Sequence, residues 1–113
     1  EVLAEVTSEF ERYETALCSN DVEQLDQFFL DSPEAVRYGT AEQLYGFEAI
    51  KAFRSARAPP GQRRLLHRVV TTYGRDFAVA SCEFQREGKT GRQSQTWLRT
   101  PSGWRVIAAH VSL

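Results

Sequence analysis

The sequence predicts an α+β fold in which three N-terminal helices pack into a strongly curved antiparallel sheet, so that the molecule forms a cone. Three observations predict this fold. The first half of the chain shows apolar residues at helical spacing, the second half contains four long strand-like runs, and only short connections separate these runs. The 113 residues support one hydrophobic core. We therefore expect a single domain over residues 1–113.

The first two helices follow from apolar spacing and a capping signal. The apolar stripe of the first helix recurs every three or four residues, which places it on one face: Leu3, Val6, Phe10, Tyr13 and Leu17. Asn20 with Glu23 three positions later resembles a capping signal, so we expect a second, shorter helix to begin there. Ser32-Pro33 should end that helix, because the residue before a proline avoids helical geometry.

A short strand and a third helix complete the first half. Glu34–Tyr38 reads as an extended segment closed by Gly39. After Gly46 we expect a helix with Ile50 and Phe53 facing inward and Arg57 continuing the same stripe. The run at 58–61, Ala-Pro-Pro-Gly, is a clear break.

The second half is predicted to be a meander of four strands. Each run is rich in valine, isoleucine, threonine and aromatic residues: Leu65–Tyr73, Phe77–Arg86, Thr90–Arg99 and Trp104–Leu113. The glycine-bearing connections predict antiparallel hairpins. Strands much longer than the usual ~5–6 residues must twist and coil. Helices can cover one face of this sheet, and the other face stays open. If the open face carries Trp97 or Trp104, it is too apolar for a monomer, so we predict a homodimer or a dimer-based oligomer.

The composition argues against nucleic acid and membranes as binding partners. Fourteen basic and fifteen acidic residues give a net charge of −1, which offers no general attraction to nucleic acid or to an anionic membrane. No apolar stretch approaches the length of a membrane span. Cys18 and Cys82 do not make a disulfide scaffold, and we expect both to be inert buried thiols. These features indicate a reducing compartment, and therefore a cytoplasmic protein.

We expect neither a metal nor an organic cofactor. The sequence has no phosphate loop, dinucleotide fingerprint or serine elbow. His67 and His110 lie far apart, and neither has a partner ligand three or four positions away. Five arginines do gather in one stretch of the chain: Arg54, Arg57, Arg63, Arg64 and Arg68. Because the chain has no basic excess elsewhere, we interpret them as a solvated rim or as the anion-binding mouth of a pocket.

Tyr13 and Arg37 are the exceptions in their elements. Tyr13 is the polar member of an otherwise apolar stripe, so it is either a core tyrosine bonded to a carbonyl or a site residue. Arg37 alternates with Val36 and Tyr38, so it either reaches solvent or points into the cone. A buried arginine requires a carboxylate or phenolate partner, or an anionic ligand.

Several stretches carry a resemblance to a known family. The order helix, helix, short strand, helix, four strands resembles the NTF2-like superfamily, and the closing run from Gly103 to Ser112 is similar to the last strand of its SnoaL-like members. The more specific stretches resemble the AtzH-like family, which is associated with bacterial catabolism of s-triazines and urea derivatives: Val36–Thr40, Leu44–Gly46, Thr71–Gly74 and Gly91–Trp97.

The resemblance implies a hydrolase in nitrogen metabolism that works without a cofactor. The implied reaction is a decarboxylating deamidation of small carboxylated ureas of the 1,3-dicarboxyurea type, as in cyanuric acid breakdown, with a possible functional link to an amidohydrolase. The implied catalytic pair is a tyrosine on the first helix and an arginine in the short strand, which Tyr13 and Arg37 match. Arg37 would either help Tyr13 to carry protons, since a nearby cation favours the ionised form of an acid, or hold the substrate carboxylate in a two-pronged contact. We also predict that Tyr13 and Arg37 face one another across the cone.

Six further residues are candidates for binding this small anionic substrate: Tyr38, Arg57, Tyr73, Gln95, Trp97 and His110. The pattern leaves open which strand face looks inward, because both alternating sets between Gly91 and Arg99 are polar. His110 reads more readily as a structural histidine than as a base.

Two other functions compete with the hydrolase. A ketosteroid-isomerase-like enzyme needs a carboxylate base, but among the acidic residues only Glu83 lies in the middle of a strand. The second alternative is a non-catalytic module that binds a small acid or supports an amidohydrolase, because a fold does not determine a function.

Overall fold

The described residues form three helices and six strands, in the order that the sequence predicts but with one additional short strand. The computed structural model describes residues 1–57 and 61–113, so most of the break expected at 58–61 lies outside the described residues. The helices are α1 (Val2–Ser19), α2 (Val22–Phe28) and α3 (Phe47–Ala56). The strands are β1 (Val36–Tyr38), β2 (Gln43–Tyr45), β3 (Arg64–Tyr73), β4 (Phe77–Arg86), β5 (Lys89–Thr100) and β6 (Gly103–Ser112).

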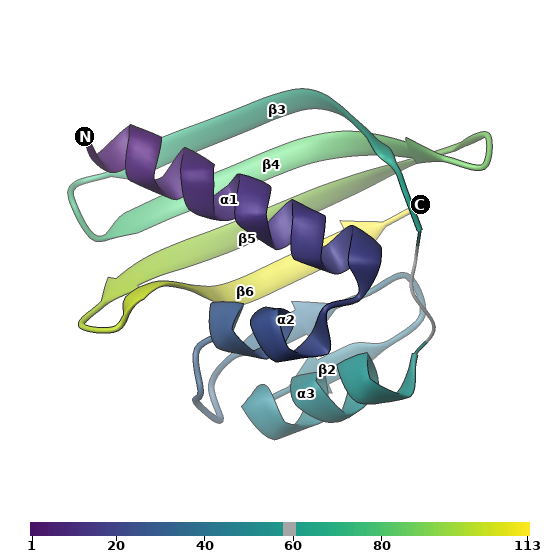
Figure 1. Ribbon diagram of the computed structural model, residues 1–113, viewed down its shortest axis with the longest axis horizontal. Helices are drawn as coiled ribbons and strands as arrows, with labels where there is room; N and C mark the ends of the chain where they lie inside the picture. The colour runs from purple at the N-terminus through teal and green to yellow at the C-terminus, as the bar shows by residue number, and fades with distance from the viewer. Residues whose placement is uncertain (58–60) are drawn as a thin grey trace.

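The strands form one curved six-stranded sheet in the order β2-β1-β6-β5-β4-β3, and the three helices lie on one side of it (Figure 1). The three predicted hairpins from β3 to β6 are confirmed. The sheet is mixed, however, because β1 pairs in parallel with β6. Sequence analysis also missed β2, since three residues are too few to show an alternating pattern.

The α1–α2 junction corrects the capping prediction. Asn20 is the C-terminal cap of α1 and adopts left-handed geometry at φ 51°, which asparagine tolerates better than most residues. The N-terminal cap of α2 is Asp21, whose side chain accepts a hydrogen bond from the Gln24 backbone N–H at 3.3 Å. Asn20 also donates from Nδ2 to the carbonyl oxygen of Arg57 at 3.2 Å, and so ties this junction to the end of α3.

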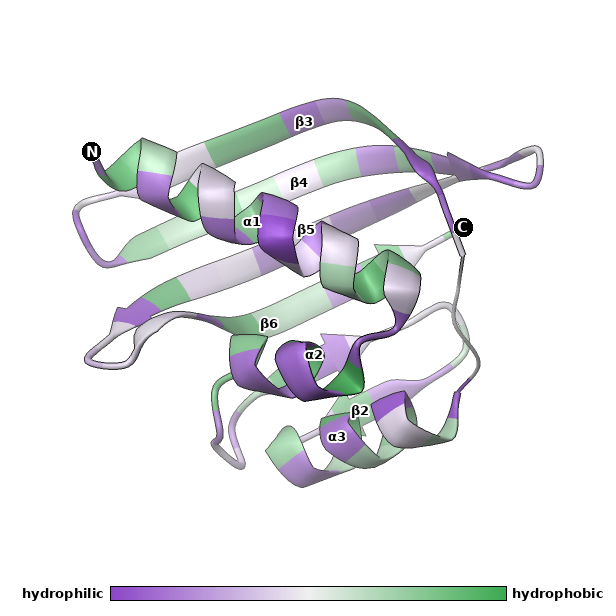
Figure 2. Ribbon diagram, in the orientation of Figure 1, coloured by the Kyte–Doolittle hydropathy of each residue, from purple (hydrophilic) through white to green (hydrophobic). Residues whose placement is uncertain are grey.

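The core lies between the helices and the inner face of the sheet. The stripe of α1 is buried as predicted except for Leu3, which lies in the first turn of the helix and is 40% exposed. Figure 2 shows the resulting alternation of hydrophobic and hydrophilic patches along α1. Trp97 and Trp104 are buried in this same core, so the expectation that they could cover the open face is wrong.

The strand register settles which face looks inward. Arg37, Ala109, Gln95 and Ala80 are paired in sequence across four adjacent strands, and paired residues share a face. All four are buried. Of the two alternating sets in β5, the inner one therefore contains Gln93, Gln95 and Trp97. Gln95 thus has a small alanine beside it on each neighbouring strand, Ala80 on β4 and Ala109 on β6.

The outer face of the sheet is exposed in the single chain. Five of the large exposed hydrophobic residues belong to its strands: Tyr38, Tyr45, Val69, Tyr73 and Phe77. Their exposed fractions range from 37% for Tyr38 to 64% for Tyr45. No helix in the described part of the chain is long and apolar enough to cross a membrane.

Candidate functional site

Tyr13 lies at the centre of an aromatic group inside the cone. It is 2% exposed, and its ring packs edge-on against Phe28 and Trp97 at centroid distances of 5.6 Å and 6.2 Å. The ring of Phe29 lies 6.3 Å away. The phenol oxygen accepts a hydrogen bond from Nη2 of Arg54. Tyr13 is therefore a core residue whose polar end is bonded to a charged side chain and not to a backbone carbonyl.

Arg54 is the most deeply buried charged residue of this group. It is 1% exposed, and its guanidinium lies 5.6 Å from the ring centroids of both Tyr13 and Phe29. Its position on α3 follows from helical spacing, because Arg54 comes four residues after the buried Ile50 and so shares its face. The expectation of a solvated rim is wrong for this arginine.

Arg37 enters the cone from β1, as one of the two sequence alternatives required. It is 5% exposed, and its Nη1 donates to Oε1 of Glu42 at 2.9 Å. Glu42 reaches Arg37 by folding back over the β1–β2 turn, where a Cβ on Gly39 would overlap the Glu42 carboxylate. The glycine predicted to close the strand is thus also what allows the ion pair to form.

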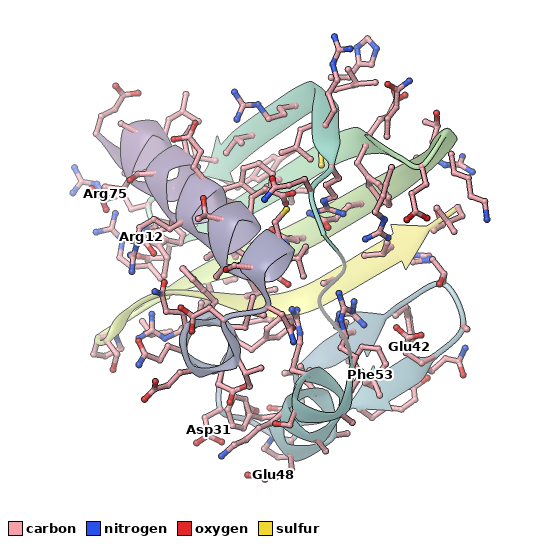
Figure 3. The ribbon with its side chains drawn as sticks, turned by 45° about the vertical axis from the view of Figure 1, so that its right-hand side comes forward. Arg12, Asp31, Glu42, Glu48, Phe53 and Arg75 are labelled. Atoms are coloured by element: carbon pink, nitrogen blue, oxygen red, sulfur yellow. The ribbon has the colours of Figure 1, made fainter. Side chains whose placement is uncertain are left out.

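Arg57 links the two buried arginines electrostatically. Its guanidinium lies 5.4 Å from the ring centroid of Phe53, and that of Arg37 lies 5.1 Å from the same ring. Figure 3 shows Phe53 and Glu42 close together at the α3 side of the molecule. Burial, followed by the positive charges of Arg54 and Arg37, lowers the pKa of Arg57 to about 10. We call Arg37, Arg54 and Arg57 the arginine cluster.

Gln95 and Trp97 complete the surroundings of Tyr13. Trp97 is fully buried, and its indole Nε1 donates to Oε1 of Gln95 at 3.1 Å. Since the Trp97 ring packs on Tyr13, this bond fixes the β5 side of the group. Of the six predicted binding residues, the structure brings Arg57, Gln95 and Trp97 into the neighbourhood of Tyr13.

The other three predicted binding residues lie elsewhere. Tyr38 and His110 are paired neighbours on the exposed outer face, where their rings pack edge-on at 5.8 Å. The Tyr38 hydroxyl lies 3.2 Å from that of Tyr45. Tyr73 is 62% exposed at the end of β3. The alternation that turns Arg37 inward necessarily turns Tyr38 outward.

Tyr13 and Arg37 do not bond to one another. Among the described residues, Tyr13 has Arg54 as its hydrogen-bond partner and Arg37 has Glu42. Sequence analysis placed Arg54 in a solvated rim or in the anion-binding mouth of a pocket, and it gave Glu42 no role. The spacing Ile50–Arg54 was the available signal for Arg54. Glu42 had none, because its role depends on the turn between two three-residue strands.

A second polar group lies beside α1 and is fully paired in charge. Arg63 donates from Nε and Nη2 to the two carboxylate oxygens of Glu14 at 2.6 Å each, and also bonds to Oε1 of Gln93 at 2.8 Å. Glu14 and Arg63 line a pocket of about 430 Å³ between α1 and β3, together with Cys18. Because Glu14 neutralises Arg63, this group lacks the excess charge of the arginine cluster.

The two cysteines are free thiols; Cys82 is buried as predicted, whereas Cys18 is only half-buried and lines the pocket beside α1. Burial raises the pKa of Cys18, and the negative charge of Glu14 raises it further. Burial also raises the pKa of Cys82. Both groups therefore stay protonated near neutral pH, as expected of inert thiols. Within residues 1–57 and 61–113, no three His, Cys, Asp or Glu side chains gather closely enough to hold a metal ion.

The chain matches one protein family over its whole given length, and it is similar to several solved structures. The family model described as AtzH-like matches residues 1–113. A crystal structure of a protein of unknown function from Pectobacterium atrosepticum is 56% identical, with a TM-score of 0.96 over 99% of this chain and 90% of that one. A cystatin-like fold protein from Burkholderia xenovorans is 48% identical, with a TM-score of 0.95 over 99% and 91%.

A more distant structure shows how far the fold extends. An NTF2-like superfamily protein from Salmonella enterica is 26% identical, with a TM-score of 0.80 over 98% of this chain and 89% of that one. Among curated proteins, none matches the chain.

Proposed function

Since the chain belongs to the AtzH-like family of NTF2-like proteins, we propose that it is a cofactor-free hydrolase of small carboxylated ureas such as 1,3-dicarboxyurea. In this reaction water attacks a urea carbonyl carbon, the C–N bond breaks, and the leaving nitrogen takes up a proton. The nitrogen leaves as carbamate, which loses carbon dioxide and gives ammonia, and the other half of 1,3-dicarboxyurea is released as N-carboxycarbamate.

The observation that supports an anionic substrate best is the charge balance of the arginine cluster. Three guanidinium groups lie in or beside the core, and one carboxylate, that of Glu42, bonds to one of them, Arg37. Unpaired buried charge is costly, and a small carboxylate inside the cone offsets that cost. Neither a neutral nor a cationic substrate would do so.

In this proposal Tyr13 and Arg37 are the catalytic pair. Tyr13 exchanges protons with the substrate, because its phenol is the hydroxyl group nearest to the cluster in the described geometry. Arg37, held by Glu42, faces the same interior and stabilises negative charge on the reacting carbonyl or on a substrate carboxylate. The two groups act on the substrate from α1 and β1, without a direct bond between them.

The test is ammonia release from purified protein. The wild type should release ammonia when it is incubated with freshly prepared carboxylated ureas. Tyr13→Phe should release ammonia more slowly than the wild type. Tyr73→Phe is the matched control, because it removes an exposed phenol at the end of β3 and leaves Tyr13 on α1 unchanged. Tight binding of these compounds without any ammonia would favour the non-catalytic alternative of a small-acid-binding module.

We place this activity in the cytoplasm, where the free thiols of Cys18 and Cys82 remain reduced. A functional link to an amidohydrolase remains part of the same proposal, since a carboxylated urea is the kind of product that such an enzyme releases.

A further inference from the structure

Arg54 has hydrogen-bonding capacity that the described residues do not use. Its Nη2 donates to Tyr13, whereas its buried Nε and Nη1 have no acceptor among those residues. Buried N–H groups in folded proteins are almost always bonded, and a buried charged group that is not bonded carries a high cost. The two N–H groups are therefore suited to receive a bound molecule.

The neighbours of Arg54 cannot neutralise it. Its guanidinium lies over the rings of Tyr13 and Phe29, which contribute weak cation–π attraction. Asp26 feels the charge of Arg54, but no hydrogen bond joins the two in the described part of the chain. Glu42 is bonded to Arg37. In the described part of the chain, no carboxylate therefore forms a direct ion pair with Arg54.

Arg37 and Arg57 add positive charge near Arg54, so the site should prefer an anion to a neutral molecule. The charges of Arg54 and Arg37 both act on Arg57 and disfavour its protonated form. A negative group placed between them removes this repulsion, whereas a neutral molecule of the same shape does not. Ordered water could also bond to the free N–H groups of Arg54, so the decisive observation is the binding of an anion.

We propose that Arg54 is the primary anion-binding residue of the cone, and that it also positions the Tyr13 hydroxyl beside the bound anion. Its Nε–H and Nη1–H groups donate to carboxylate oxygens, and its Nη2–H group holds the phenol oxygen. Since that oxygen accepts from Arg54, the Tyr13 O–H remains available to a second partner. Arg37 is then the second guanidinium, set by Glu42. Anion binding by Arg54 does not require that the protein be a hydrolase. Only the catalytic use of the positioned Tyr13 hydroxyl rests on the proposed function.

The experiment measures anion binding without turnover. Malonate and inorganic phosphate are titrated calorimetrically into the wild type, Arg54→Met, Arg54→Lys and Arg68→Gln. Losing charged hydrogen bonds should weaken binding of the better probe roughly 10- to 100-fold in Arg54→Met. Arg54→Lys should lose nearly as much, because an ammonium does not reproduce the donor geometry. Arg68→Gln, which removes an exposed arginine on β3, should bind like the wild type.

Thermal stability separates a binding role from a structural one. The double variant Tyr13→Phe/Arg54→Met removes both partners of the buried bond and should melt at or above the wild-type temperature without ligand, since buried charge is costly. The wild type should gain thermal stability with the anion, and the double variant should not.

Three outcomes would overturn the proposal. They are a wild type that binds neither probe, an Arg54→Met variant that binds with wild-type affinity, and failure of both Arg54→Met and the double variant to fold. Failure of the proposed function looks different. In that case the anion titrations give the expected pattern, and the protein still releases no ammonia from carboxylated ureas.

Discussion

At the scale of single residues, the molecule places charged and phenolic groups where a hydrophobic core would ordinarily continue. Arg54 occupies a helix position that faces Ile50's side of α3, and Tyr13 occupies the middle of the α1 stripe. Each is almost fully buried, and each is the other's hydrogen-bond partner. A core that served stability alone would place apolar residues of similar volume at these positions.

Tyr13→Phe provides the sharpest test of catalysis at this scale. The change keeps the ring contacts with Phe28 and Trp97 but removes the hydroxyl. If the phenol transfers protons, kcat should fall by roughly 10²–10⁴ in the ammonia assay. Near-normal turnover in Tyr13→Phe would return this residue to a purely structural role.

The lowered pKa of Arg57 predicts that anion binding is coupled to proton uptake at high pH. Burial and the charges of Arg54 and Arg37 lower its pKa to about 10, so it begins to lose its proton as the pH rises through that value. A bound anion favours the charged form and raises this pKa again. Malonate binding near pH 10 should therefore take up protons, and binding at pH 7 should not, because Arg57 is charged there in both states.

Calorimetry in two buffers of different ionisation enthalpy checks this coupling. At pH 10 the apparent binding enthalpy should differ between the buffers, and at pH 7 it should not. Arg57→Gln should remove the difference at pH 10. A difference that persists in Arg57→Gln would assign the proton uptake to another group.

At the scale of elements, the β1–β2 turn is the part that sets Arg37. Gly39 leaves room for the Glu42 carboxylate, and its backbone N–H donates to the carbonyl oxygen of Glu42 at 2.9 Å. The turn thus holds a buried cation in place with a residue only five positions away.

Gly39→Ala should therefore impair the site without unfolding the protein. The added Cβ collides with the end of a flexible side chain, so Glu42 moves away and the backbone is little disturbed. We expect the free energy of unfolding to change by less than about 1 kcal/mol, while kcat falls roughly tenfold because Arg37 loses its orientation. Urea unfolding and the ammonia assay measure the two effects. Glu42→Gln should reproduce the activity loss, and normal activity in both variants would contradict this role of the turn.

The elements also show what could be predicted from the sequence. The long strands and the apolar face of α1 were predictable, because each repeats a pattern over ten or more residues. The inward face of α3 was predicted only in part, since Ile50 is buried but Phe53 is half-buried and Arg54 is the second buried residue of this helix. Strand β2 and the Asn20 cap were not, since three residues or one cap carry too little pattern. The candidate site followed the same division. Tyr13 and Arg37 stood out as exceptions to a pattern, whereas the partnerships with Arg54 and Glu42 depend on how distant elements dock.

At the scale of the whole molecule, the open outer face predicts an oligomer. Val69, Tyr73 and Phe77 expose about half or more of their surfaces there, although the tryptophans that first suggested an apolar face are buried inside. A monomer rarely leaves a sheet face of this kind in water. We expect a homodimer or a dimer-based oligomer, with a light-scattering mass at least twice the 12.9 kDa of one chain.

Phe77→Lys should shift this equilibrium toward the monomer, because a charge on the outer face must be buried at the interface. Leu3→Lys is the matched control, since Leu3 is similarly exposed but lies on α1. A single-chain mass for the wild type at micromolar concentration would overturn the expectation, as would an unchanged dimer in Phe77→Lys.

The parallel pairing of β1 with β6 has a consequence for the order of assembly. β1 pairs with β2 on one side, but its neighbour on the other side is β6, which comes some seventy residues later in the chain. Such a long-range pairing slows folding, because a loop of some seventy residues must close first. Until then Arg37 has no sheet to anchor it opposite α1. Every residue of the arginine cluster therefore precedes, in the order of synthesis, the strand that fixes Arg37 in the sheet.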